Sequence, residues 1–297
     1  MEQNKRRSLL KAAIAGAALG GVSLPARADV VRVGHVGLSF YEVTAHVIRW
    51  FLEKQGWNVA LDSGSHSNMF PKVAKGEVDL FVAAWLPYAH ADYWQEYGKD
   101  LVKVSTLFED AQLYWAVPDY IPASQVGSVQ DLTKPEVAAR MVKTIRGTLP
   151  DSGLMIGSQK IFQHYDLKGS GYDLVPGPSK EWLANFNARI EAKEWFVMPL
   201  WRPQYLNRQH KLRVLQEPKA FLGGPNSAYL VASQDFWSRL DKRKKAMLAR
   251  MELSLRSVTL MDYWVNVEGM TPSAAARQWI GTNPDTVGFW MAGPEEN

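Results

Sequence analysis

Aromatic side chains are the residues of this sequence whose type and spacing point to chemistry, and Trp85 is the first of them. Trp85 follows an apolar run of strand length, residues 80–84, and Pro87 comes two positions later. A buried strand of a parallel sheet is such a continuous apolar run, and ligands of open α/β sheets bind beyond the carboxyl ends of the strands. We therefore expect Trp85 at the mouth of a cleft, with Pro87 beginning the next helix. An ordinary core position is the alternative for this ring.

Trp201 repeats the arrangement in the second half of the chain, where it follows a predicted strand and precedes Pro203. Trp182 lies near the start of a predicted helix, and a surface-facing aromatic is the alternative there. Tryptophan is a poor acid, base or nucleophile, but its ring face attracts a diffuse cation by ~0.5–2 kcal/mol. A quaternary ammonium has no N–H to donate, so ring faces are its best partners. Three or four rings together could hold it with about micromolar affinity.

Patterns typical of catalytic, metal and phosphate sites are absent from the sequence. It contains no Cys, no Gly-x-Ser-x-Gly, no His-Glu-x-x-His and no complete phosphate-binding loop. His90 and Asp92 lie two positions apart at a predicted helix start, which is a poor geometry for a metal ion. We therefore expect no metal and no cofactor. An enzyme stays open as an alternative, with a dispersed acid–base pair such as Glu42 and Asp110 as its best candidate.

Length and charge narrow the classes of protein further. The 297 residues exceed one usual hydrophobic core and suggest two domains. The formal net charge of +4 comes from the first 28 residues, and the rest of the chain is close to neutral. A nucleic-acid-binding protein would present a basic face, so this distribution argues against that class.

The first 28 residues are predicted to be an export signal of the twin-arginine type. They combine a charged start containing Arg6 and Arg7, an apolar segment at residues 12–22 and the small residues Ala26 and Ala28. The apolar segment is too short to span a bilayer. Cleavage after Ala28 would place the mature chain in the periplasm. An N-terminal membrane anchor is the alternative.

The remaining pattern predicts an α/β fold in which strands and helices alternate in each half of the chain, which indicates parallel sheets with right-handed crossovers. The predicted strands are residues 30–33, 57–61, 80–84, 113–117, 142–145, 172–175 and 195–200. The predicted helices are residues 41–55, 69–75, 154–165 and 179–193. From Gln234 onward the chain is predicted to be helical, with residues 242–256 strongly amphipathic.

The stretch from Asp79 to Trp94 resembles the substrate-binding proteins of ABC importers for glycine betaine and related quaternary amines. Further matches follow in the family's order and cover essentially everything after residue 29. They are Leu200-Trp-Arg-Pro203, Leu215-Gln-Glu-Pro218, Gln278-Trp-Ile280 and Asn283-Pro-Asp285. The resemblance implies a type II periplasmic-binding-protein fold, two α/β lobes with the ligand cleft between them. Lobe I would comprise residues 29–118 and 211–297, and lobe II residues 119–210.

The resemblance also implies a set of ligand-binding residues. Three would be cage rings, five would offer backbone contacts from two loops, and two would stand in a motif that many relatives fill with His and Trp. The cage rings are Trp85, Trp201 and the weaker match Trp182. The backbone contacts are Gly37, Leu38, Ser39, Gly153 and Leu154. The motif positions are Gln204 and Tyr205. The first turn carries Phe40-Tyr41 in place of the family's usual Trp.

The sequence therefore predicts a monomeric periplasmic binding protein that delivers a small quaternary amine to an ABC permease and its ATPase. Backbone donors suit a carboxylated betaine, whereas a choline site would want an acidic acceptor such as Glu42 or Asp110. Glycine betaine or a related betaine is thus the expected ligand. A choline or carnitine binding protein, an enzyme on the same fold and a sensory receptor domain are the alternatives.

Overall fold

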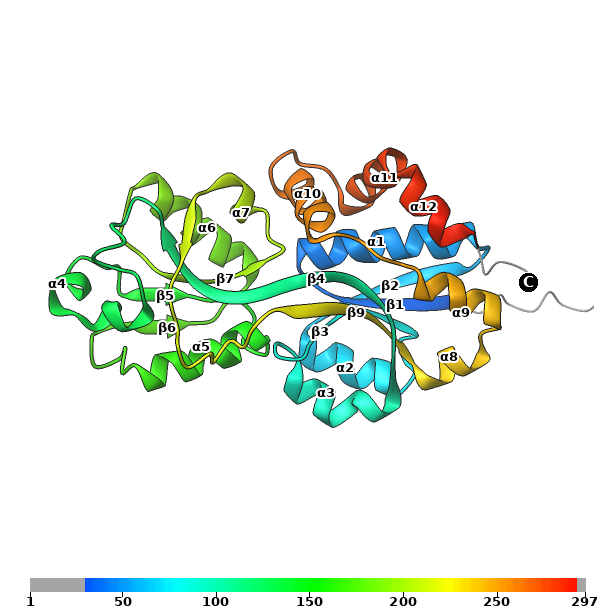
Figure 1. Ribbon diagram of the computed structural model, residues 1–297, viewed down its shortest axis with the longest axis horizontal. Helices are drawn as coiled ribbons and strands as arrows, with labels where there is room; N and C mark the ends of the chain where they lie inside the picture. Colours follow the sequence, from blue (N-terminus) through cyan, green and yellow to red (C-terminus); the bar gives the residue numbers. More distant parts are fainter. Residues whose placement is uncertain (1–29, 293–297) are drawn as a thin grey trace, which may run out of the picture.

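The computed structural model describes residues 30–292, which form two lobes lying side by side (Figure 1). The predicted export signal at residues 1–28 and its cleavage position lie outside the described residues. One lobe, here the first lobe, holds the early and late parts of the chain. Its elements are β1 (Val30–Val36), α1 (Ser39–Lys54), β2 (Asn58–Gly64), α2 (His66–Ala74), β3 (Leu80–Leu86), α3 (Ala91–Tyr97), η1 (Gly98–Asp100), β9 (Asn226–Ser233), α8 (Gln234–Arg239), α9 (Lys242–Ala249), α10 (Leu255–Asn266), α11 (Pro272–Thr282) and α12 (Pro284–Met291).

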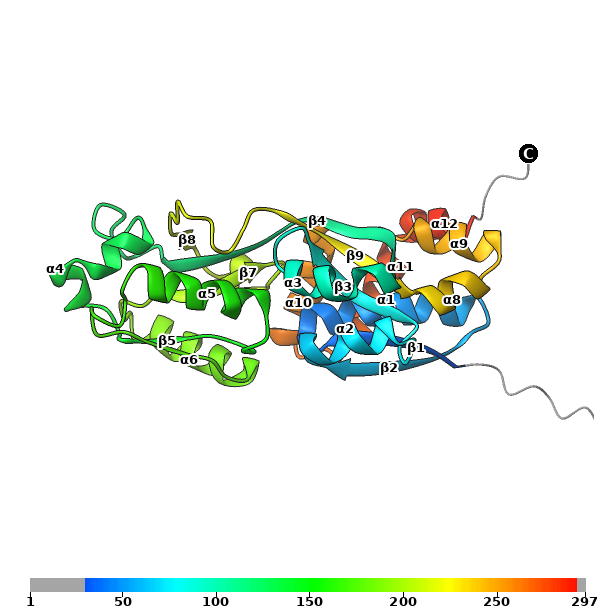
Figure 2. The same ribbon diagram turned by 90° about the horizontal axis from the view of Figure 1, so that it is seen from below.

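The second lobe is built from the middle of the chain. Its elements are η2 (Val129–Thr133), α4 (Pro135–Ala138), β5 (Thr144–Arg146), α5 (Gly153–His164), β6 (Asp173–Val175), α6 (Ser179–Glu191), β7 (Met198–Arg202), α7 (Leu206–Gln209) and β8 (Leu212–Val214). The long strand β4 (Leu101–Pro118) runs through both lobes, as both views show (Figures 1 and 2).

The sheet of the first lobe has the order β2-β1-β3-β9-β4. β1 pairs in parallel with β2 and β3, which confirms the predicted parallel arrangement of the first three strands. β9 then pairs antiparallel with both β3 and β4, so the sheet is mixed. All seven residues of β3 are buried, because helices cover both faces of the sheet and only an apolar strand fits there.

Helices lie on either face of this sheet, with α1, α11 and α12 above it and α2, α3 and α8 below it in Figure 1. The apolar positions predicted for the first helix are all buried in α1, including Val43, Val47 and Phe51. Gly56 follows this helix at a φ of +84°, a conformation that favours glycine. α10 and α11 pack against α1, so the C-terminal helices cover the first lobe.

Two local predictions in the first lobe are wrong. The amphipathic helix expected over residues 242–256 is two helices, because Ser254 accepts a hydrogen bond from the Ser257 N–H and starts α10 anew. Pro87 does not begin a helix either, since α3 starts only at Ala91. The residues after Pro87 form a turn instead, in which the N–H groups of Tyr88 and Ala89 donate to Asn226 Oδ1 at 2.8 and 3.0 Å.

The chain crosses between the lobes inside β4. This strand pairs with β9 as far as Ala111 and with β7 from Gln112 onward, and its last residues pair with β8. The chain returns between β8 and β9, through residues 215–225. The lobe boundaries at residues 118/119 and 210/211 stay a prediction, and this exchange of strand partners favours a first crossing ahead of residue 118.

Candidate ligand-binding site

Trp85 lies one residue before the end of β3, with 2% of its surface exposed. Its ring centroid is 5.7 Å from that of Phe40 and 6.1 Å from that of Tyr41, both in the first turn of α1. The backbone N–H of Trp85 donates to Nδ1 of His90 at 2.9 Å, which ties the turn after β3 to the strand end. β3 and α1 together therefore fix three aromatic rings against one another.

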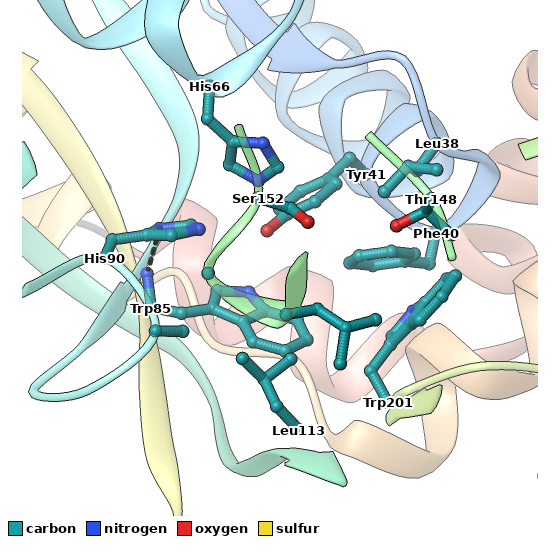
Figure 3. Close-up of a pocket in the computed structure, with 13 residues that line it drawn as sticks. Leu38, Phe40, Tyr41, His66, Trp85, His90, Leu113, Thr148, Ser152 and Trp201 are labelled. Atoms are coloured by element: carbon teal, nitrogen blue, oxygen red, sulfur yellow. Dashed lines mark hydrogen bonds between the residues drawn. The ribbon is translucent and has the colours of Figure 1, made fainter. Parts of the chain in front are cut away.

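Trp201 brings a fourth ring from the second lobe. It is the fourth residue of β7, and its ring centroid lies 6.0 Å from that of Phe40. Phe40 thus stands between Trp85 and Trp201, and rings from both lobes meet at one place (Figure 3). The structure brings together the two tryptophans that were predicted to form the cage, although their binding role stays a prediction.

A cavity that is partly open to solvent lies between these rings, with about 30 Å³ of space that the centre of a water molecule can reach. Its wall is mainly apolar and aromatic, with a few polar groups from both lobes, as expected of small-molecule sites. The lining residues are Leu38, Phe40, Tyr41, His66, Trp85, Ala89, His90, Leu113, Thr148, Ser152, Gly153, Leu154 and Trp201. We call this space the ring cavity. Five of the ten predicted site residues line it, namely Leu38, Trp85, Gly153, Leu154 and Trp201.

The other predicted site residues lie around a second cavity on the opposite side of Phe40 and Trp201. Leu38, Phe40 and Trp201 line both spaces. The second cavity is lined by Gly37, Leu38, Ser39, Phe40, Glu42, Ser179, Lys180, Trp182, Leu183, Trp201, Gln204, Tyr205, Asp262, Val265 and Asn266. The expected set of ten residues therefore divides over two neighbouring spaces instead of surrounding one.

Trp182 does not line the ring cavity. Its ring stacks on Trp201, with centroids 4.9 Å apart, and it is 2% exposed. The surface-facing alternative for this residue is therefore wrong, because the first turn of α6 packs inward against β7. Trp182 supports the position of Trp201 from behind, and in this arrangement it offers no ring face to the ring cavity.

The backbone donors expected in the first turn are largely occupied within the protein. Gly37 N–H donates to the Gly64 carbonyl at 3.2 Å, and Leu38 N–H donates to the Val36 carbonyl at 2.8 Å. Gly153 and Leu154, in contrast, open α5 beside the ring cavity. The first N–H groups of a helix have no partner within the helix and favour an anion. The second loop is thus better placed than the first to meet a ligand carboxylate.

Gln204 and Tyr205 are engaged in local structure. The side-chain oxygen of Gln204 accepts from the Leu206 N–H at 2.5 Å, and the Tyr205 N–H donates to Oδ2 of Asp262 at 2.8 Å. Neither residue lines the ring cavity. Gln204 stays a predicted ligand-binding residue, and in this arrangement its side-chain oxygen closes the turn after β7.

Two buried histidines form the polar side of the ring cavity. The rings of His66 and His90 lie 4.8 Å apart. Burial lowers the pKa of His66 to about 4 and lowers the pKa of His90 well below its usual value. Nδ1 of His90 accepts a hydrogen bond from Trp85, so the proton of this neutral ring is on Nε2. The ring cavity therefore contains polar groups but no carboxylate and no cationic side chain at neutral pH.

Several lining residues were not predicted as site residues. Phe40 and Tyr41 were noticed only as a departure from the family's first turn, although they supply two of the four rings. His66 begins α2 in the first lobe and Ser152 directly precedes α5 in the second, and only the closed arrangement of the lobes brings them together. Their proximity is a long-range contact, which spacing along the chain does not reveal.

We also searched the described residues for a metal site, for an assembled acid–base pair and for a helix that could span a membrane. Within residues 30–292, no group of three His, Asp or Glu side chains is arranged to hold a metal ion. The acid–base pair considered for an enzyme is separated, because Glu42 lines the second cavity whereas Asp110 is exposed on β4 and lines neither space. No helix in this part of the chain is long and apolar enough to cross a membrane.

The two lobes and the ring cavity between them define a solute-binding protein of the two-lobed periplasmic type. The OpuAC family model, described as the substrate binding domain of ABC-type glycine betaine transport systems, matches residues 29–282, and the chain belongs to this family. The family and fold that the sequence resemblance implied are therefore confirmed. The family is defined by substrate binding for transport and not by catalysis.

One curated relative is the glycine betaine/carnitine transport binding protein GbuC of Listeria monocytogenes, which is 24% identical over 178 residues. That match covers 55% of this chain and 54% of GbuC, so the chain spans about half the length of the relative.

Solved structures show the same fold at low identity. Lactococcal OpuAC, closed on glycine betaine, has a TM-score of 0.78 at 24% identity and covers 88% of this chain and 98% of its own. ProX of Borrelia burgdorferi has a TM-score of 0.81 at 22% identity, with coverages of 90% and 97%. A choline-binding protein of an ABC transporter, in complex with choline, has a TM-score of 0.78 at 19% identity, with coverages of 89% and 91%.

Proposed function

We propose that this chain captures a small quaternary ammonium solute in the ring cavity, and that the solute is glycine betaine or a related betaine. The observation that carries the proposal is the meeting of Phe40, Trp85 and Trp201 from both lobes at one buried space. A trimethylammonium group is best met by ring faces, each worth ~0.5–2 kcal/mol and more when water is excluded. Three rings would then support about micromolar affinity after the costs of association.

The composition of the wall favours a carboxylated ligand. No acidic residue lines the ring cavity, so the acidic acceptor expected of a choline site is missing from its wall. Gly153 and Leu154 begin α5 there, and a helix start favours a negative charge. A betaine would place its ammonium among the rings and its carboxylate toward α5. The neutral His90, with its proton on Nε2, is a further donor on the same wall.

Delivery to an ABC permease and its ATPase at the inner membrane is the role that family membership supports. The predicted signal at residues 1–28 would export the chain and leave a mature protein that begins at Asp29 in the periplasm. We propose that the mature protein acts as a monomer. A choline or carnitine binding protein is the second candidate, since the name of the Listeria relative includes carnitine and a structure of the same fold holds choline.

Side-by-side calorimetric titrations of the mature protein test the proposed ligand. Glycine betaine is expected to bind with about micromolar affinity and at least tenfold more tightly than choline, a gap of about 1.4 kcal/mol. Carnitine and proline betaine complete the comparison. Tighter binding of choline would contradict the betaine assignment, and the absence of binding by every quaternary amine would contradict the proposed function as a whole.

A further inference from the structure

Asp262 is a buried carboxylate that contacts both lobes. It lies in α10 of the first lobe and is 1% exposed. Its Oδ1 accepts from Ser39 Oγ at 2.5 Å and from Asn266 Nδ2 at 3.0 Å, both within the first lobe. Its Oδ2 accepts from the Tyr205 N–H at 2.8 Å, and Tyr205 follows β7 in the second lobe. One side chain therefore receives donors from each side of the space between the lobes.

Asp151 makes the converse connection from the second lobe. It lies in the loop between β5 and α5, and its Oδ2 accepts from the Ser67 N–H at 2.8 Å in the first turn of α2. The hydroxyl of Tyr93, on α3, donates to the backbone carbonyl of Asp151 at 2.9 Å. Both partners belong to the first lobe. Asp151 immediately precedes Ser152 and Gly153, which line the ring cavity.

These contacts exist only while the lobes are together. Separation of the lobes would remove the Tyr205 donor from Asp262 and the Ser67 and Tyr93 donors from Asp151. A buried carboxylate that loses a donor without gaining water is penalised. Asp262 is the more costly of the two to leave underbonded, because burial raises its pKa to about 6 even with its present donors. Opening is therefore opposed at two places, one on each side of Phe40 and Trp201.

We propose that Asp262 and Asp151 are paired interlobe latches, one contributed by each lobe, which hold the protein closed and thereby set how slowly a bound solute leaves. The proposal rests on the proposed function, since a release rate requires that the ring cavity holds a solute. It assigns a use to Ser39 and Tyr205, two predicted ligand contacts that also donate to Asp262. Neither latch residue lines the ring cavity, so both act on binding through closure.

Release of glycine betaine, measured by stopped-flow tryptophan fluorescence, tests the latches. Asp262→Asn keeps the shape of the side chain but replaces one accepting oxygen with a donor, and Tyr93→Phe removes a single hydroxyl. The release rate should rise at least tenfold in Asp262→Asn and at least threefold in Tyr93→Phe. The association rate should change less than the release rate, because the ring cavity itself is untouched.

Asp131→Asn is the matched control. Asp131 accepts from Gly127, Ser128 and Lys134, all within one segment of the second lobe. Its replacement should lower the melting temperature and leave the release rate within twofold of the unaltered protein. Release rates within twofold in both latch variants, or equal acceleration by Asp131→Asn, would overturn the proposal. If Asp262→Asn does not fold, Tyr93→Phe and Asp151→Asn decide by the same criterion.

A readout without ligand separates this inference from the proposed function. Fluorophores on exposed positions of the two lobes report the distance between the lobes in the ligand-free protein. The Asp262→Asn and Tyr93→Phe proteins should shift to longer distances than the unaltered protein. If the unaltered protein binds no betaine, the proposed function is contradicted. The latches are overturned separately, if the interlobe distance distributions of the two variants coincide with that of the unaltered protein.

Discussion

At the scale of single residues, the proposed cage consists of neutral rings and contains no charged group. A carboxylate in the cage would attract an ammonium but would first lose its own hydration, which is costly in a buried site. Phe40, Trp85 and Trp201 would avoid that cost, because they carry no charge to desolvate. Trp182 stacks on Trp201 and thereby supports the orientation of that ring.

Replacement of Trp85 by Ala should weaken glycine betaine binding by about 1–3 kcal/mol, because a ring contact and part of the enclosure are lost. Trp85→Phe should recover part of that loss. The measurement is calorimetric titration, with circular dichroism to confirm that each variant is folded. Trp237→Ala is the control, since Trp237 is a half-buried ring on α8 that lines neither cavity. Unchanged affinity in Trp85→Ala would contradict the assignment of the cage.

The residue types could be predicted from the sequence, but their partners could not. A strand end carrying Trp and then Pro predicted that Trp85 and Trp201 would face a shared space. The occupied amides of Gly37 and Leu38 and the hydrogen bond that the Leu206 N–H donates to Gln204 are details of turn geometry, which residue types alone do not determine. The structure places Trp85 and Trp201 at one shared space, as expected, and divides the predicted polar contacts between two spaces.

At the scale of elements, the ring cavity depends on where strands end and helices begin. β3 and β7 present Trp85 and Trp201 near their ends, and the first turns of α1 and α5 supply part of the remaining wall. α5 starts so close to the first lobe that a Cβ on Gly153 would lie 2.0 Å from the carbonyl oxygen of Ala89. Glycine at this position permits the contact between the lobes.

Gly153→Ala should therefore interfere with closure while leaving each lobe folded. Because the added methyl group meets backbone, which cannot turn away as a side chain could, we expect glycine betaine to bind at least tenfold more weakly. Gly281→Ala in α11 is the matched control, since a Cβ there meets nothing within 4 Å. That substitution should leave affinity unchanged and raise stability by about 0.4–1 kcal/mol. Equal affinities in the two variants would argue against tight closure at Gly153.

Elements with regular apolar patterns were predicted well, and the elements that join the lobes were not. The first three strands and α1 follow the apolar periodicity closely. β9 and the first half of β4 were missed because they pair antiparallel at the middle of a sheet whose other strands suggested a parallel order. Pro87 was expected to start a helix, but bonds from Tyr88 and Ala89 to Asn226, far along the chain, hold a turn there instead.

At the scale of the whole molecule, both lobes contribute residues to the candidate site. Rings from both surround the ring cavity, one strand passes through both, and Asp262 and Asp151 each receive a donor from the opposite lobe. A ligand that touches both lobes favours the closed state, because only differential contacts shift such an equilibrium. We therefore expect ligand binding and lobe closure to be coupled in this protein.

The two-lobed architecture could be inferred from the sequence because the strand–helix pattern restarts in the second half. The closed juxtaposition of the lobes could not, since it depends on contacts between residues more than 50 positions apart, such as Tyr93 with Asp151. The division of the expected ligand-binding residues between two cavities also depends on such long-range contacts. Short motifs marked the region of the site but did not show which face of Trp201 a ligand meets.

A crystal structure of the mature protein with bound glycine betaine tests the central claim most directly. The account predicts the trimethylammonium group in the ring cavity, within about 6 Å of the ring centroids of Phe40, Trp85 and Trp201. It also predicts the carboxylate near the start of α5 at Gly153 and Leu154. A ligand bound instead in the second cavity, between Trp182, Tyr205 and Asp262, would contradict it.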